Sequence, residues 1–396
     1  PALELAGNAA GVVSGAFAQH MPQNQIVAQE VNLGLIREIV PPEGHIGLST
    51  IAPWLSVESD DVVFDYVKGS GSGLAPARAE DAESELWTDD EFYSGRGSAS
   101  VIDWALKNHY TASDVSRYRE MLNVISQTEG QGGSFPLTVN SITEGFQAKV
   151  ARDTRKRKNR LDNRIEWLIM EGISKGAIEY NDGKIRFKVD YGRPTDQHDQ
   201  APKSGSYATN EHDPLNDILD VQEKMYDKYG VTLKRAICSR KFLNTLYRSK
   251  KWGLLSGLGP NSGVDGDDMN YLLPGWGPQA AVDRIAQETG LVFTVSDNVM
   301  RTRSVGSTSF TNTRYFPQDQ VIFLPDEAEI SAYDDTEIGF AKTLTSPHPM
   351  ADWQTGFYSW ERETTDPWGH DIGTGVKAFP VFAHMDLSYT MKVELS

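Results

Sequence analysis

The longest regular pattern of apolar and polar residues in the chain runs from residue 141 to residue 175. No proline interrupts it, and apolar side chains recur at the three- and four-residue spacing of one helical face: Ile142, Phe146, Val150, Leu161, Ile165, Leu168 and Ile169. Ser141, followed three positions later by Glu144, has the spacing of a capping box, and Gly176 tolerates the left-handed backbone that ends a helix. The sequence therefore predicts one helix over residues 141–175, roughly 50 Å long.

The middle of this predicted helix is basic. Residues 149–166 contain three acidic and eight basic positions, the basic ones being Lys149, Arg152, Arg155, Lys156, Arg157, Lys158, Arg160 and Arg164. A solvated charged face is the simplest interpretation. Apolar residues at helical spacing are absent from residues 151–160, however. This part of the helix therefore needs charged or polar partners to stabilise it. We therefore expect something acidic to lie on the helix.

An acidic segment earlier in the chain matches this requirement. Residues 69–100 are rich in glycine and serine at both ends, and strand-like patterns at 63–68 and 98–104 flank an acidic, aromatic centre. Its key residues are Glu80, Asp81, Glu83, Glu85, Trp87, Asp90 and Glu91. The GSGSG stretch lacks the Gly-Lys-Ser/Thr ending of a phosphate-binding loop. We predict a projecting loop that contacts the basic helix of a neighbouring copy through many ion pairs, because each exposed pair contributes less than about 1 kcal/mol.

The remaining patterns divide the chain further. Residues 1–40 read as an arm without a core of its own, 46–51 as a strand, 110–125 as a helix, and 177–189 as a hairpin. Helices and strands alternate from about residue 213 to 335, which favours a compact mixed subdomain containing a long loop at 251–277. The end of the chain, 378–395, alternates like a strand or a bent pair of strands.

Composition narrows the class of protein. A chain of 396 residues with 39% hydrophobic and 10% aromatic residues fits a folded protein of two or three domains. The net charge of −17 argues against a sequence-reading nucleic-acid binder, which needs positive charge over its contact surface. Cys238 is the single cysteine, so no intrachain disulfide is expected, and a small buried strand residue is the favoured interpretation. No apolar run long enough to span a membrane and no secretory signal are recognised, which favours a reducing cytoplasm or a particle assembled there.

Catalytic motifs are weak. The pairs His198-Asp199 and His212-Asp213, together with Asp265, Asp267 and Asp268, contain metal-ligating residue types, but their spacing fits no metal motif. No H-E-x-x-H sequence occurs. Trp353, Trp360 and Trp368 in a loop-rich region suggest either sugar stacking or packing, and packing is favoured. We predict no catalytic residue, no cofactor and no metal.

The order of these parts resembles the major capsid proteins of tailed double-stranded DNA bacteriophages, in particular the lambda-type head protein. Four stretches carry the resemblance: LAPARAEDAE at 74–83, FKVDYGRP at 187–194, VIFLPDEAEISAYDDTEIGFAKT at 321–343 and AFPVFAHMDLSYTMKVEL at 378–395. The resemblance covers roughly residues 45–395 and rests mainly on the order of the elements.

This resemblance implies an α+β protein with the Johnson fold. It would have an N-terminal arm (1–44), the first part of a peripheral domain (45–62) and an extended loop (63–104). The peripheral domain would continue through 105–212 and hold the spine helix (141–175). An axial domain (213–335) and a return through both domains with a C-terminal strand (336–396) would complete the chain.

The implied function is a non-enzymatic subunit that assembles into hexamers and pentamers of an icosahedral shell. Its partners would be other copies of itself, portal and scaffold proteins, a cement protein, and packaged double-stranded DNA through weak non-specific contact, with no membrane. It would reside in the virion, and in the host cytoplasm during assembly. The contact residues would be the acidic-loop residues above with Arg152, Arg155, Arg157, Arg160 and Arg164. The alternatives are an encapsulin-like nanocompartment shell and, from a different class, a metal-dependent hydrolase or a sugar-binding module.

Overall fold

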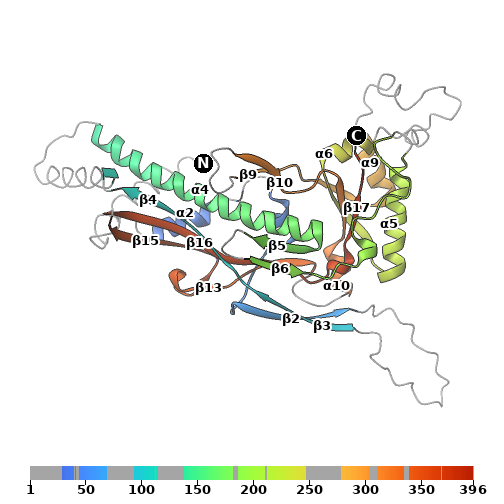
Figure 1. The fold of residues 1–396 in the computed structure, drawn as a ribbon, viewed down its shortest axis with the longest axis horizontal. Coiled ribbons are helices and arrows are strands. Elements are labelled where there is room, and N and C mark those ends of the chain that lie inside the picture. Colours follow the sequence, from blue (N-terminus) through green and yellow to red (C-terminus); the bar gives the residue numbers. More distant parts are fainter. Residues whose placement is uncertain are drawn as a thin grey trace, which may run out of the picture.

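A long helix lies across one sheet, and a second sheet separates two hydrophobic cores (Figure 1). The computed structural model describes residues 29–39, 41, 44–68, 93–111, 113–114, 138–181, 186–209, 212–246, 278–302, 310–333, 339–366 and 368–395. Helices and strands are mixed along the chain, as the predicted α+β class requires.

The long helix α4 spans Thr138–Lys175, and its 38 residues correspond to about 57 Å. The predicted end is confirmed, because Gly176 follows Lys175 with a φ of 69°, in the left-handed region. The predicted start was wrong by three residues. Residues 138–140 contain neither proline nor glycine, so nothing stops the helix from beginning before Ser141.

The sheet beneath α4 is built around one 15-residue strand, β16 (Trp368–Phe382). The last part of β16 pairs with β12 (Ala341–Thr345), which pairs in turn with β1 (Trp54–Ser56). The rest of β16 lies between β15 (Phe357–Thr365) and β4 (Asp103–Thr111). The tryptophan-containing region predicted to be loop-rich is therefore largely a β-hairpin.

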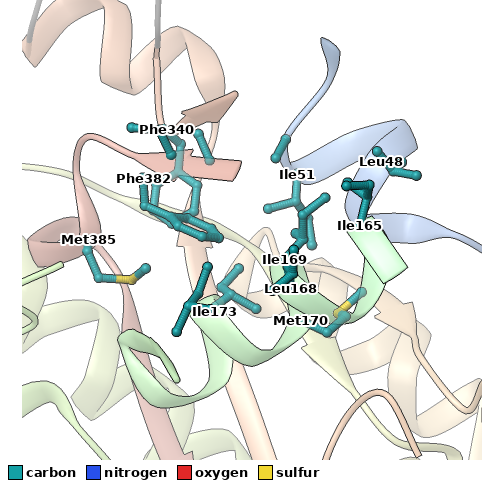
Figure 2. Close-up of a cluster of buried hydrophobic side chains, with 14 of the residues drawn as sticks. Leu48, Ile51, Ile165, Leu168, Ile169, Met170, Ile173, Phe340, Phe382 and Met385 are labelled. Atoms are coloured by element: carbon teal, nitrogen blue, oxygen red, sulfur yellow. The ribbon is translucent and has the colours of Figure 1, made fainter. Parts of the chain in front are cut away.

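The first core lies between the C-terminal half of α4 and this sheet. Ile165, Leu168, Ile169 and Ile173 of α4 are fully buried, and Figure 2 shows them beside Leu48, Ile51, Phe340, Phe382 and Met385. Burying each such side chain contributes roughly 1.5–3 kcal/mol relative to exposure. The apolar stripe read from the sequence is thus the face of α4 that holds the first core together.

A one-turn helix, η1 (Gly47–Ile51), replaces the strand predicted at 46–51. The carboxylate of Glu166 on α4 accepts hydrogen bonds from the backbone N–H groups of Gly47 at 2.9 Å and Leu48 at 3.0 Å. These N–H groups begin a helix and have no partner within it. A buried carboxylate 119 residues away therefore stabilises the turn that the local sequence does not predict.

The second sheet has the order β17 (Tyr389–Lys392), β11 (Gln320–Pro325), β7 (Leu233–Cys238) and β8 (Val292–Val295). Successive side chains of a strand point to opposite faces. Ala236, Cys238 and Phe323 accordingly enter the second core, while Ile237 and Ile322 enter the first. The predicted burial of Cys238 is confirmed.

In the described part of the chain, the helices that pack on this sheet through the two cores are α5 (Pro214–Tyr229), α6 (Arg240–Leu246), α9 (Pro278–Thr289) and α10 (Glu327–Tyr333). The side chain of Asp213 caps the start of α5 by accepting a bond from the Asn216 N–H. The mixed character predicted for 213–335 is confirmed. Its edge strand β17, however, comes from the end of the chain, and residues 251–277 lie outside the described part.

Four two-stranded ribbons complete the strands: β5 (Ala177–Asn181) with β6 (Arg186–Asp190), β2 (Asp61–Lys68) with β3 (Tyr93–Ser100), β9 (Val299–Thr302) with β10 (Thr311–Arg314), and β13 (Pro347–His348) with β14 (Gln354–Thr355). The predicted hairpin at 177–189 is confirmed, although its turn at 182–185 is outside the described residues. The strand predicted at 98–104 is interrupted at 101–102, where β3 ends and β4 begins.

The structure also refines the predictions for segments near both ends of the chain. The C-terminal segment is a bent pair, β16 and β17, joined through the short helix η4 (Met385–Leu387). The helix predicted at 110–125 was wrong at its start, because β4 continues to Thr111, and residues 115–125 lie outside the described part. Residues 29–38, predicted to belong to the arm, form helix α2 (Gln29–Glu38), which packs on β15 and α4 with Ile36 buried.

Candidate inter-subunit surface

The basic residues of α4 fall into an inward and an outward group. Arg157 points inward: its side chain is buried, with the residue only 3% exposed. Its guanidinium donates to Thr374 Oγ1 at 3.1 Å, Asn108 Oδ1 at 2.9 Å and Thr154 Oγ1 at 2.7 Å. Arg157 is therefore occupied inside its own chain, and we leave it out of the predicted contact surface.

Lys158 and Arg164 also have partners within the chain. Lys158 forms a buried pair with Asp162 at 2.7 Å and lies 4.8 Å from the ring centre of Phe357. The Arg164 guanidinium lies 5.2–5.7 Å from the ring centres of Trp104, Trp167 and Tyr180. Such cation–π contacts contribute roughly 0.5–2 kcal/mol each. Arg164 is thus partly engaged by aromatic side chains of its own subunit.

Polar contacts hold the part of α4 that lacks an apolar stripe. The Tyr110 hydroxyl on β4 donates to Asp153 at 3.2 Å, next to Arg157. Burial, together with the negative charge of Asp153, raises the pKa of Tyr110 to about 12, and burial lowers the pKa of Arg157. The polar partners expected for residues 151–160 are found in β4 and β16.

The outward group forms a row along α4. Arg152, Arg155, Lys156 and Arg160 are all exposed, and at 1.5 Å per residue the row is about 12 Å long. Lys156 lies 4.0 Å from Asp153. Arg152, Arg155 and Arg160 form no ion pair with any residue of the described ranges. We call Arg152, Arg155, Lys156 and Arg160 the arginine row.

The β2–β3 ribbon extends from the body of the subunit (Figure 1). Its strands pair from Asp61 and Ser100 to Lys68 and Tyr93, and the open end points away from the N-terminal half of α4 (Figure 1). The acidic loop that it carries, with Glu80, Asp81, Glu83, Glu85, Trp87, Asp90 and Glu91, lies outside the described residues. Its contact with the arginine row stays a prediction.

The base of the ribbon is fixed by residues that the sequence analysis missed. Asp60 accepts from Lys377 Nζ at 2.7 and 2.9 Å and from Ser346 Oγ at 2.7 Å. These hydrogen bonds lower the pKa of Asp60. Asp60, Ser346 and Lys377 are far apart in the sequence. Only knowledge that β12 pairs with β16 could have indicated that these residues meet.

Among the described residues, the histidine and aspartate residues considered as metal ligands do not come together. His198 Nδ1 is 3.9 Å from Asp199, and both ring nitrogens of His212 contact backbone oxygens. In the ranges that the structure describes, no group of three potential metal ligands comes together. Asp265, Asp267 and Asp268 lie outside those ranges. Of the helices in the described part of the chain, none has both the length and the apolar character needed to cross a lipid bilayer.

The three tryptophans occupy different settings. Trp360 lies over Gly373 of the neighbouring strand, and the Trp368 indole N–H donates to Glu363 at 2.6 Å. Trp353 is 72% exposed. Trp360 and Trp368 therefore contact their own chain, as the packing interpretation expects, whereas Trp353 is exposed.

Comparison with known proteins gives two kinds of match. The sequence model of the family described as phage major capsid protein E matches residues 109–253. The crystal structure of a prophage capsid protein from Escherichia coli CFT073 superposes with a TM-score of 0.52 at 14% identity, covering 93% of this chain and 99% of that one. The chain has the fold of phage capsid proteins.

A second structure agrees with this fold. A phage-related protein from Bordetella bronchiseptica RB50 has a TM-score of 0.50 at 14% identity, covering 93% of this chain and 97% of that one. No curated protein matches in sequence. The capsid fold confirms the resemblance and the fold class predicted from the sequence, whereas the assignment of α4 as a spine helix stays a prediction.

Proposed function

We propose that the chain is a major capsid protein that assembles into hexamers and pentamers of an icosahedral shell around the double-stranded DNA of a tailed phage. The observation that carries the proposal is the structural match to the prophage capsid protein, which covers 93% of this chain and 99% of that one. The family match over residues 109–253, which includes all of α4, supports it. The role is structural and not enzymatic.

The proposed inter-subunit contact uses one rigid and one extended partner. The arginine row sits on a helix held by buried polar and apolar contacts, so its geometry is fixed before assembly. The loop at 69–92 can reach at most about 40 Å from the end of the β2–β3 ribbon, judged from extended-chain length. Since the ribbon points away from its own arginine row, the row of a neighbouring copy is the natural partner.

The two cores correspond to the proposed domains. The first core, with α4, would form the peripheral domain, and the second core, most of whose residues lie in 213–335, the axial domain at the centre of each capsomer. Because the two cores share opposite faces of one sheet, we infer that the domains move as one body during assembly.

The charge of the chain fits a container for DNA. A subunit with a net charge of −17 repels phosphate, which lets packaged DNA slide past the wall. Portal, scaffold and cement proteins, and residence in the virion after assembly in the host cytoplasm, belong to the proposal on the strength of the fold.

Electron microscopy and sedimentation of the purified protein test the proposal. We expect closed particles or capsomers built of one chain type. A monomer at every concentration, with no particle in the producing cells, contradicts it. Particles filled with a protein cargo instead of DNA would favour the nanocompartment alternative.

A further inference from the structure

The turn between β13 and β14 is held rigidly by its own backbone. Pro347 pairs with Thr355 and His348 with Gln354, and the short helix η3 (Pro349–Ala351) lies between them. The Trp353 N–H donates to the His348 carbonyl at 3.1 Å. His348 also accepts from the Met350 N–H at 3.1 Å, and its ring stacks on Tyr358 at 3.9 Å. The turn therefore has one defined shape.

In this turn, two residues in an unfavourable backbone conformation present the bulky side chain of Trp353. Asp352 and Trp353 have φ values of 52° and 60°, a region that residues other than glycine avoid. The Trp353 residue is nevertheless 72% exposed, and the neighbouring Met350 is 49% exposed. An exposed tryptophan contributes little to the stability of its own subunit. Within the monomer, therefore, its contacts do not offset the backbone strain of the turn.

A hollow of about 810 Å³ lies beside this turn. Met350 and Asp352 form one wall, and Lys107, Trp360, Arg362 and Thr364 contribute to the other side. Arg362 is exposed and forms no ion pair within the described ranges. The hollow is open to solvent, and its volume is large enough to receive an indole.

We propose that Trp353 of one copy inserts into the hollow beside the same turn of a second copy. This inference rests on the proposed shell function, and it names a contact separate from the arginine row. Of its lining residues, Arg362 supplies a guanidinium for cation–π contact, Met350 a thioether and Trp360 an aromatic ring, beside the carboxylates of Asp352, Glu361 and Asp371.

The second copy is the favoured occupant because projection and hollow share residues. Met350 and Asp352 belong both to the turn and to the wall of the hollow, so the two features lie side by side on one face. A surface that carries a projection next to its receptor associates with itself through reciprocal insertion. Tryptophan is also among the residues most enriched at interface hot spots.

Site-specific photo-cross-linking tests the contact directly. The photoreactive amino acid p-benzoylphenylalanine would replace Trp353, and particles and free subunits would be irradiated and analysed by mass spectrometry. We expect a cross-linked dimer of two chains that joins position 353 to a peptide containing Trp360, Arg362 or Thr364. A cross-link confined to one chain, a cross-link to any other surface, or no cross-link in intact particles overturns the inference.

The same experiment separates this inference from the proposed function. Particles without the 353 cross-link leave the shell function standing and remove the contact. A 353 cross-link in a dimer that never forms particles keeps the contact and removes the shell function. A strict monomer without cross-links removes both.

Substitution to glycine distinguishes docking from folding. Gly adopts the left-handed backbone without cost, so Trp353→Gly should leave the unassembled subunit at least as resistant to urea as the wild type. We expect the concentration needed for assembly to rise about tenfold or more, which corresponds to loss of a hot-spot residue. Trp353→Phe, which keeps an aromatic ring, should assemble with a smaller change. Equal assembly of Trp353→Gly and wild type contradicts the proposal.

Discussion

The guanidinium of Arg193 donates a hydrogen bond of 2.5 Å to the carbonyl oxygen of Ile173, in the last turn of α4. It also donates to the Ser174 carbonyl at 3.2 Å and to Ser388 Oγ at 3.0 Å. The final carbonyls of a helix have no partner within it. Arg193 therefore links the end of α4 to the segment that leads into β17, where the two cores meet.

Replacement of Arg193 by methionine should destabilise the subunit. The variant leaves the two α4 carbonyls buried without their donor, and bonds to a charged group contribute roughly 1.5–3 kcal/mol each. We expect the free energy of unfolding to fall by at least about 2 kcal/mol, measured by urea denaturation of unassembled subunits. Arg186→Met, at an exposed position of β6, is the control, with an expected change within about 0.5 kcal/mol. Equal effects of both variants would exclude the linking role.

Glu166 should make stability depend on pH in an unusual direction. Burial raises its pKa to about 7, against the two N–H bonds from η1, which lower it. The folded state thus holds the proton more tightly than the unfolded state, whose pKa is near 4.5. The contribution of Glu166 to the free energy of unfolding is complete below pH 4.5. It is lost as the pH rises towards 7, by on the order of 1 kcal/mol per pH unit.

Glu166→Gln isolates this effect from its neighbours. Asp162, His45, Lys158 and Tyr315 lie around the same site, and burial raises the pKa of Asp162 but lowers that of His45. The wild type should gain stability relative to the variant as the pH falls from 7 to 5, measured by denaturation at each pH. Parallel curves for the two proteins would refute the assignment to Glu166.

Arg157 and Arg155 should behave in opposite ways although they are two residues apart. Arg157→Met removes a buried donor from Thr374, Asn108 and Thr154, so we expect a loss of about 3 kcal/mol in stability. Arg155→Met should change stability by less than about 0.5 kcal/mol but weaken assembly, measured by particle yield. A stability loss at Arg155 as large as that at Arg157 would contradict the division of α4 into two faces.

Gly373 should tolerate no side chain. A Cβ atom there would lie 2.1 Å from the Trp360 ring across the strand pair. We expect Gly373→Ala to cost about 1–3 kcal/mol in thermal or urea unfolding. Gly34→Ala in α2 is the matched control, because nothing lies within 4 Å and alanine favours a helix by up to about 1 kcal/mol. The two substitutions should therefore differ in sign.

Local signals in the sequence predict helices and strands such as those named below. Features that depend on contacts between residues distant in the sequence cannot be predicted in this way. The end of α4 at Lys175, the β5–β6 hairpin and α5 follow from periodicity, turns and caps. The turn η1 could not be predicted, because its N–H groups bind Glu166 on another element. The charge of α4 was evident, but its division into buried Arg157 and exposed Arg155 depends on β4 and β16.

Charge exchange between two subunits tests the central claim most directly. Glu83, Glu85 and Asp90 would be changed to lysine in one variant, and Arg152, Arg155 and Arg160 to glutamate in the other. Arg152→Lys, Arg155→Lys and Arg160→Lys together form the control that keeps the charge and should still assemble. Each reversed variant should fold but yield few particles by electron microscopy. Combining both reversals in one chain should restore the particles, because the three changed loop residues and the three changed row residues attract one another again with opposite signs. Full-sized shells from either single reversal, or no recovery in the combined variant, would contradict a contact between the acidic loop and the arginine row.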